Sequence, residues 1–173
     1  MRRLIGRSLG GFAAGAAGTV AMGGMSFLLR RMVEPNEPIG KTHYEQVIEW
    51  AAEKSGKEEE IDPASRVRQG ELLHLGFGAF WGVVFALLFR RRKVRPLLHG
   101  SMFGITLWTG AFGGYMPALG VSRSLKNMNA YEFLRTLLCH LTYAVTTATF
   151  MKAFRSASGQ QAPATCMTKP KNV

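Results

Sequence analysis

The chain has 173 residues, 47% of them hydrophobic, which suits a single domain of ordinary size. Its net charge is +11, but the charges are clustered between long runs that carry none. This clustering argues against a nucleic-acid-binding surface, and a chain this small could not bury four such runs as a soluble bundle.

A helix needs about 20 mainly apolar residues to cross about 30 Å of hydrocarbon. The fourth charge-poor run is the shortest, and it reaches full length when Arg135 and Lys152 extend outward along the helix ends. We therefore expect an all-α polytopic membrane protein with four transmembrane helices. The predicted spans are residues 8–29, 72–89, 96–119 and 131–152.

The charges predict the orientation of these spans. The N-terminus, the connection between the second and third spans and the tail carry three, five and four basic residues and no acid. All 11 acids lie on the other two connections. Short basic loops stay in the cytoplasm, so we expect both termini there. The first span is long and ends in "LLRRM", which indicates an uncleaved span rather than a secretory signal.

Glycines recur every four residues in the first span and are paired in the next two. Residues four apart share a helix face, and rows of small residues let helix backbones approach closely in lipid. We interpret the rows as helix-packing surfaces, with a glycine-lined pore as the alternative. The packing residues are Gly11, Gly15, Gly78, Gly82, Gly100 and Gly104.

Residues 33–70 form a hydrophilic outer loop with one predicted amphipathic helix. Thr42 and Glu45 make a capping box, apolar residues follow at helical spacing, and Gly56 ends the pattern, which predicts a helix over 42–55. This helix either covers the bundle on its outer surface or docks a partner. The segment after this helix, residues 56–70, is predicted to be a solvated loop. The membrane domain is predicted to span residues 1–155, and residues 156–173 to form a disordered cytoplasmic tail.

Ionisable side chains within spans are candidate functional residues. His74, His99 and His140 lie in spans two, three and four, whereas His43 is expected to be solvated. At about 1.5 Å per residue, His74 lies about 5 Å from the outer face and His140 about 13 Å, with His99 near the inner face. Two haem ligands need similar depths on facing helices, so interhelical hydrogen bonding is favoured over haem ligation.

Glu132 and Arg135 lie three residues apart at the outer entrance of the fourth span. They can pair along one helix face or mark the entrance of a proton or ion route. No phosphate-binding loop, nucleophile elbow or two-histidine zinc helix is present in the sequence. We therefore expect a protein that is not an enzyme and has no metal and no cofactor.

The chain resembles the YagU-like group of small bacterial inner-membrane proteins over roughly Gly10 to Phe154. The resemblance is carried by "GFAAGAAGTVAM", "EPNEPIGKTHYEQVIEW", "HLGFGAFWGVVFALL", "LHGSMFGITLWTGAFGGYMPALG" and "CHLTYAVTTATF". It implies a multi-pass protein of the bacterial inner membrane and brings neither an established activity nor catalytic residues.

Three functions are therefore compatible with the sequence. The first is a structural or accessory protein that packs in the bilayer with itself or with another membrane protein. The second is a small transporter or channel whose polar route is lined by the intramembrane histidines. The third is a haem-binding redox protein.

Overall fold

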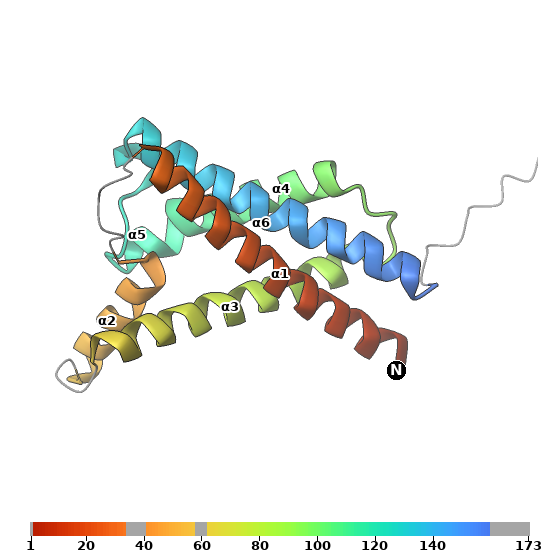
Figure 1. Ribbon diagram of the computed structural model, residues 1–173, viewed down its shortest axis with the longest axis horizontal. Helices are drawn as coiled ribbons and strands as arrows, with labels where there is room; N and C mark the ends of the chain where they lie inside the picture. The colour runs from red at the N-terminus through yellow and green to blue at the C-terminus, as the bar shows by residue number, and fades with distance from the viewer. Residues whose placement is uncertain (1, 34–40, 58–61, 160–173) are drawn as a thin grey trace, which may run out of the picture.

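The computed structural model describes residues 2–33, 41–57 and 62–159, and side chains from residue 5 onward. Within these ranges the chain is an all-α protein without strands (Figure 1). The long helices are α1 (Arg2–Val33), α3 (Pro63–Leu88), α4 (Pro96–Gly110) and α6 (Ala130–Ala157), and α2 (His43–Ser55) is shorter. α6 thus extends two residues into the predicted tail, and residues 160–173 lie outside the described part of the chain.

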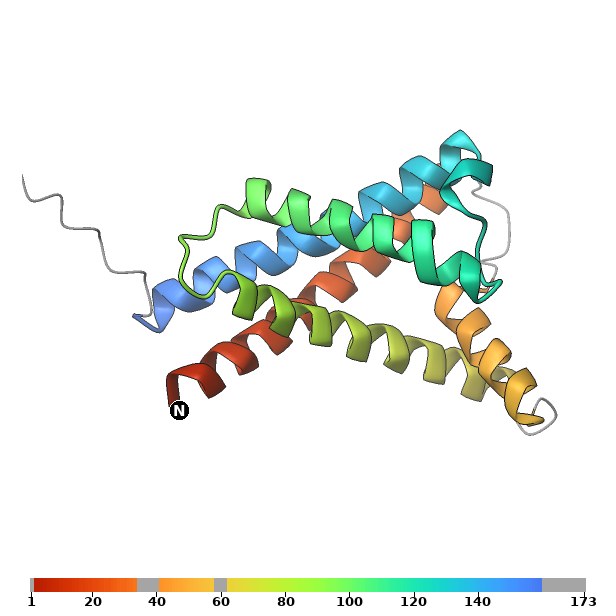
Figure 2. The same cartoon turned by 180° about the vertical axis from the view of Figure 1, so that it is seen from behind.

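α1 crosses the bundle in contact with both α3 and α6, and α4 packs on the other side of α6 (Figures 1 and 2). The N-terminus, the 89–95 connection and the end of α6 lie together, and we call this the basic end. α2 and the 119–129 connection lie at the opposite end, the α2 end. The Tyr131 hydroxyl donates to the Leu29 carbonyl (3.4 Å) at the α2 end, which ties α6 to α1 there.

Glycine allows the backbones of α1 and α3 to touch. A Cβ added at Gly15 would lie 2.9 Å from the Gly82 Cα, and one added at Gly11 would lie 2.8 Å from the Gly82 carbonyl oxygen. These separations are too short for any side chain. The neighbouring Thr19 hydroxyl donates to the Gly15 carbonyl (3.0 Å), so it is satisfied within its own helix.

α4 and α6 meet in the same way. A Cβ at Gly100 would lie 2.8 Å from the Val145 Cα, and one at Gly104 would lie 2.8 Å from the His140 carbonyl oxygen. All six glycines assigned to helix packing therefore lie at helix contacts. Other glycines of the same rows, such as Gly23 and Gly110, have nothing within 4 Å of an added Cβ.

The helix after Gly110 widens before it ends. Residues Ala111–Tyr115 form a π-helical turn (η2), and Met116–Ala118 (α5) continue the helix. π-turns of this kind recur at functional sites in helices. Here the turn brings Phe112 into a buried cluster with Trp108 and Met116, against which Val47 and Trp50 of α2 pack. The cluster thereby fixes one side of α2.

The start of α3 corrects the prediction of a solvated loop over residues 56–70. The helix begins at Pro63, because the Asp62 carboxylate accepts from the Ala64 and Ser65 amides (2.9 and 3.0 Å) and proline is favoured at the first helical position. The Asp-Pro pair was the signal for this start.

Two helices, Ile5–Val33 and Pro63–Leu88, are long and apolar enough to cross a membrane. Large apolar side chains also point outward from the bundle, with Val20 70% exposed and Leu97 75% exposed. The chain is therefore a helical protein with the features of a membrane protein.

Candidate binding cavity beneath helix α2

A cavity of about 400 Å³ lies at the α2 end and is lined by residues of α1, α2, α3, α6 and the η2 turn. Three histidines from three different helices line it: His43, His74 and His140. The sequence predicts two of these at different depths and the third in solvent. The structure brings all three to one cavity.

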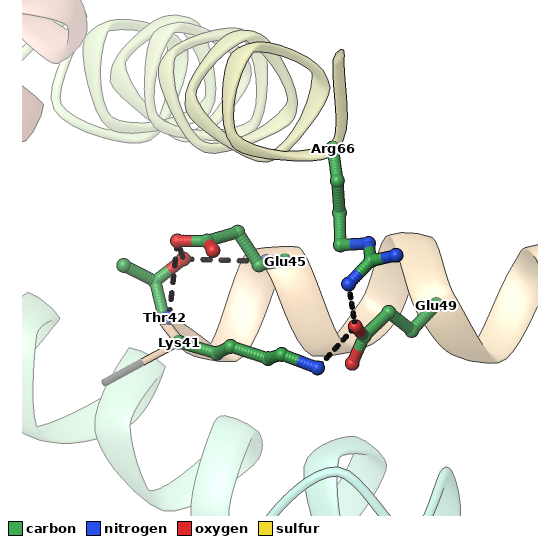
Figure 3. Close-up of polar contacts among 5 residues, drawn as sticks. All are labelled: Lys41, Thr42, Glu45, Glu49 and Arg66. Atoms are coloured by element: carbon green, nitrogen blue, oxygen red, sulfur yellow. Dashed lines mark hydrogen bonds and ion pairs between the residues drawn. The ribbon is translucent and has the colours of Figure 1, made fainter. Parts of the chain in front are cut away.

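α2 is held over this cavity by specific polar contacts (Figure 3). The predicted capping box is present: the Glu45 amide donates to the Thr42 hydroxyl (3.2 Å), and the Thr42 amide donates to the Glu45 carboxylate (3.1 Å). Glu49 binds both Lys41 and, on α3, Arg66 (each 2.5 Å). The Arg66 ion pair therefore joins α2 to the first turn of α3.

Gly70 lets α2 approach α3 closely. An added Cβ there would lie 3.0 Å from the Glu45 backbone nitrogen, so a larger side chain would push the start of α2 away. Because His43 and Tyr44 belong to the same turn of α2, this contact also sets their position above the cavity.

His43 is half-buried rather than solvated, which corrects the sequence analysis. Its ring meets the ring of Phe112 edge-on, with centroids 5.4 Å apart. Burial, with the Arg135 charge as the second cause, lowers the pKa of His43 from 6.5 to about 4. Its spacing offered a signal: His43, Val47 and Trp50 lie at i, i+4 and i+7, and the last two pack on the cluster that contains Phe112.

The other two cavity histidines are held by different contacts. The ring of His74 stacks on Tyr44 of α2, with centroids 4.3 Å apart and planes at 20°. The His140 Nδ1 lies 2.8 Å from the Thr136 carbonyl oxygen, which can only accept, so Nδ1 donates and Nε2 is left as an acceptor. The ring of Phe112 also contacts the His140 ring, with centroids 5.7 Å apart, so Phe112 touches both His43 and His140.

Glu132 and Arg135 both line the cavity, but no ion pair joins them among the described side chains. Arg135 instead donates from Nη1 to the Ser26 hydroxyl of α1 (3.1 Å). The predicted pairing along α6 is therefore replaced by a contact between helices. Ser26 was not singled out in the sequence because a lone serine in an apolar run carries no local signal.

His99 lies apart from this cavity, at the basic end. Its Nδ1 accepts from the Arg95 amide (2.9 Å), and its ring lies against Phe89 with centroids 4.8 Å apart. An amide at the start of α4 thus obtains a partner. This contact gives His99 a capping role.

A second cavity, of about 520 Å³, lies between α3 and α4 and is lined mostly by apolar side chains. It adjoins the first, since five residues line both: Met22, Tyr44, His74, Tyr115 and His140. The Trp81 indole nitrogen is buried without a hydrogen-bond partner among the described residues, and Trp81 lines this cavity. Nearby, the Tyr143 hydroxyl donates to the Gly78 carbonyl (2.6 Å).

The chemistry of the first cavity favours binding. Three permanent cations line it (Arg30, Lys41 and Arg135) against one carboxylate, Glu132. Among the described residues, no three His, Cys, Asp or Glu side chains are grouped so that they could hold a metal ion. The side chains therefore suit an anion better than a metal ion.

A family model described as "Protein of unknown function (DUF1440)" matches residues 54–149. The chain belongs to this family. The DUF1440 match covers α3, α4 and most of α6, so His74, Arg135 and His140 lie within it, whereas α1 and His43 precede it. No curated protein and no solved structure matches the chain. The DUF1440 assignment brings no activity with it, and the resemblance to the YagU-like group stays a prediction.

Proposed function

We propose that this DUF1440 protein crosses the bacterial inner membrane four times and that the cavity beneath α2 is a binding site. The two further spans would be α4 with its continuation to Ala118, and α6, whose 28 residues correspond to about 42 Å of helix. Both helices present large apolar side chains outward, a pattern that soluble proteins rarely tolerate over so wide an area. Examples are Leu97, Leu98, Met102, Phe133, Leu134 and Phe150.

The proposed orientation puts the basic end in the cytoplasm and the α2 end outside, because short loops rich in lysine and arginine are retained inside. The cavity beneath α2 then opens toward the outer side of the membrane. Lipid covers the exposed apolar faces, and a second copy or another membrane protein can pack on them in an accessory role.

One observation carries the binding proposal: side chains from four helices converge on a space that nothing in the described chain fills. Packing alone would not produce it, since protein interiors are normally close-packed. Where this bundle is built for packing, as at Gly15 and Gly82, the backbones touch. Where α2, α3 and α6 meet, histidines and Arg135 surround an opening instead.

Transport is the second candidate function, and the continuity of the two cavities favours it. Together they extend from Lys41 at the α2 end to Leu88 and Phe89 near the basic end. Such a path would take a bound molecule along most of the bundle. The haem-binding alternative gains no specific support from the described residues, and it stays a prediction.

Two adjacent glycines provide a matched test. Gly23 lines the cavity, Gly24 does not, and neither has an atom within 4 Å of an added Cβ. We expect a small molecule extracted from purified wild-type protein and from Gly24→Phe to be absent from Gly23→Phe, at equal expression. Identical extracts from all three proteins, measured by mass spectrometry, would count against a binding site here.

A further inference from the structure

We infer that the occupant of the two adjoining cavities is one molecule of an anionic phospholipid, with its phosphate headgroup beneath α2 and an acyl chain between α3 and α4. This inference rests on the proposed function and names the ligand class of the same site. It follows from the chemical difference between the two cavities and from their shared wall.

The charges of the first cavity fit a phosphate headgroup. Lys41 is engaged by Glu49, but neither ion pair among the described residues includes Arg135. The hydrogen bond described for Arg135 uses one N–H of its guanidinium group, which carries five donors. Arginine binds phosphate through several of these donors at once. Arg135 is thus positioned to hold an anion while it stays bound to Ser26.

The second cavity fits a hydrocarbon chain. Its walls include Phe77, Phe103 and Leu107, and an apolar space gains free energy when hydrocarbon fills it. It also opens on the surface of the bundle, because Leu88 (64% exposed) and Met102 (60% exposed) line it. In a four-span protein this opening faces the bilayer, so an acyl chain can enter from the side.

The residues shared by the two cavities place the charged groups next to the apolar space, which is the arrangement that a lipid requires. His74, Tyr115 and His140 belong to both cavities. The charged side chains line only the first cavity, and the apolar side chains Phe77, Phe103 and Leu107 line only the second. A soluble phosphate ester would occupy only the first cavity, and a neutral lipid would leave Arg135 without an anion. A single anionic lipid matches both.

Native mass spectrometry of the detergent-purified full chain tests the inference with three probes: dioleoyl phosphatidylglycerol, dioleoyl phosphatidylcholine and glycerol 3-phosphate. We expect one phosphatidylglycerol to bind at least about tenfold more tightly than phosphatidylcholine, because only the former presents an unopposed phosphate to Arg135. Glycerol 3-phosphate, which lacks a chain, should bind weakly.

Two matched pairs of variants locate the two parts of the lipid. Arg135→Gln should remove the preference for phosphatidylglycerol, whereas Arg91→Gln, an exposed change in the basic loop, should keep it. Gly110→Leu should weaken binding of both lipids, because Gly110 lines the apolar cavity and has room for a side chain. Gly76→Leu should leave the binding of both lipids unchanged, because Gly76 also has room for a side chain but lines neither cavity.

Equal binding of the two lipids, or a preference that survives Arg135→Gln, would overturn the inference. Equal binding of glycerol 3-phosphate and phosphatidylglycerol would overturn the assignment of the chain. In either case, loss of a copurifying molecule from Gly23→Phe but not from Gly24→Phe would still support a binding site in the first cavity. The lipid assignment and the binding-site proposal can therefore fail independently.

Discussion

α3 packs against its two neighbours in opposite ways: its backbone touches that of α1, whereas large side chains separate it from α4. Toward α1, glycines remove the side chains, and the two backbones touch at Gly15 and Gly82. Toward α4, large side chains such as Trp81 and Phe103 meet edge-on with ring centroids 6.2 Å apart, and a cavity remains beside them. One helix thus carries a close backbone contact on one face and an open space on the other. The close contact packs the bundle, and the open space is where we propose that a ligand binds.

A bulky residue at the centre of the α1–α3 contact should disrupt this close backbone packing most directly. Gly15→Leu should prevent normal assembly, because a Cβ there already lies 2.9 Å from the Gly82 Cα and 3.0 Å from the Ala79 Cα. Overpacking costs about 1–3 kcal/mol even in cores that can adjust. Gly24→Leu, where the added side chain meets nothing within 4 Å, is the matched control. Equal yield and equal thermal stability of both variants in detergent would argue against a tight α1–α3 contact.

The next largest effect is expected at the basic end, where a side chain of α6 forms hydrogen bonds to the end of α3. Arg155, only 8% exposed, donates to the carbonyl oxygen of Ala86 (3.3 Å) in the last turn of α3 and to those of Phe89 (3.1 Å) and Arg92 (3.2 Å) in the turn that follows it. Arg155→Met should lower the free energy of unfolding by about 2 kcal/mol. The exposed neighbour Lys152→Met should leave it unchanged, and equal unfolding temperatures for the two variants would show that the capping contacts are unimportant.

The burial of His43 in the cavity beneath α2 should show itself in the pH dependence of stability. The pKa of His43 is about 4 in the folded protein and 6.5 when the residue is solvated. The unfolded chain therefore binds more protons between these values, and stability should fall as the pH decreases from 6.5 to 4, by about 1–2 kcal/mol for a half-buried group. It should change little further below pH 4 on account of this residue.

His43→Gln should flatten this part of the stability profile, because an amide does not titrate in the same range. Thermal unfolding in detergent at a series of pH values measures the effect. An unchanged slope between pH 6.5 and 4 in the variant would show that His43 is solvated after all.

The smallest effects are expected from single changes at the other two cavity histidines. His140→Gln keeps a donor for the Thr136 carbonyl, and His74→Gln loses the stacked contact with Tyr44. Interhelical polar contacts in membranes average about 0.6 kcal/mol, so both variants should fold with nearly wild-type stability and without a bound chromophore. A Soret band in the wild type that disappears in both variants would instead support haem ligation.

Local patterns in the sequence predicted those parts of the structure that depend on neighbours along the chain. Thr42 and Glu45 indicated the start of α2, and the spacing of Gly11, Gly15, Gly78 and Gly82 pointed to surfaces that lie at the α1–α3 contact. In each case a residue and its partner lie within one helical turn or follow its period.

The cavity could not be predicted in this way because it depends on how helices cross. His74 and His140 were assigned different depths from where charges end along each span, yet the crossing of α3 and α6 and the wide η2 turn bring both to one space. Arg135 donates a hydrogen bond to Ser26 of α1, a partner 109 positions away in the sequence, rather than to the nearby Glu132. No periodic pattern within one span predicts such a contact between helices.

The central claim, a four-span protein with α2 outside, is tested most directly by cysteine labelling at three positions in a chain whose Cys139 and Cys166 are replaced by serine. Lys57→Cys, Lys126→Cys and Arg91→Cys are all exposed and lie on three different connections. Four spans predict that a membrane-impermeant maleimide labels positions 57 and 126 in intact spheroplasts and position 91 only after permeabilisation. If only α1 and α3 crossed the membrane, position 126 would share the behaviour of position 91, and that result would contradict the account.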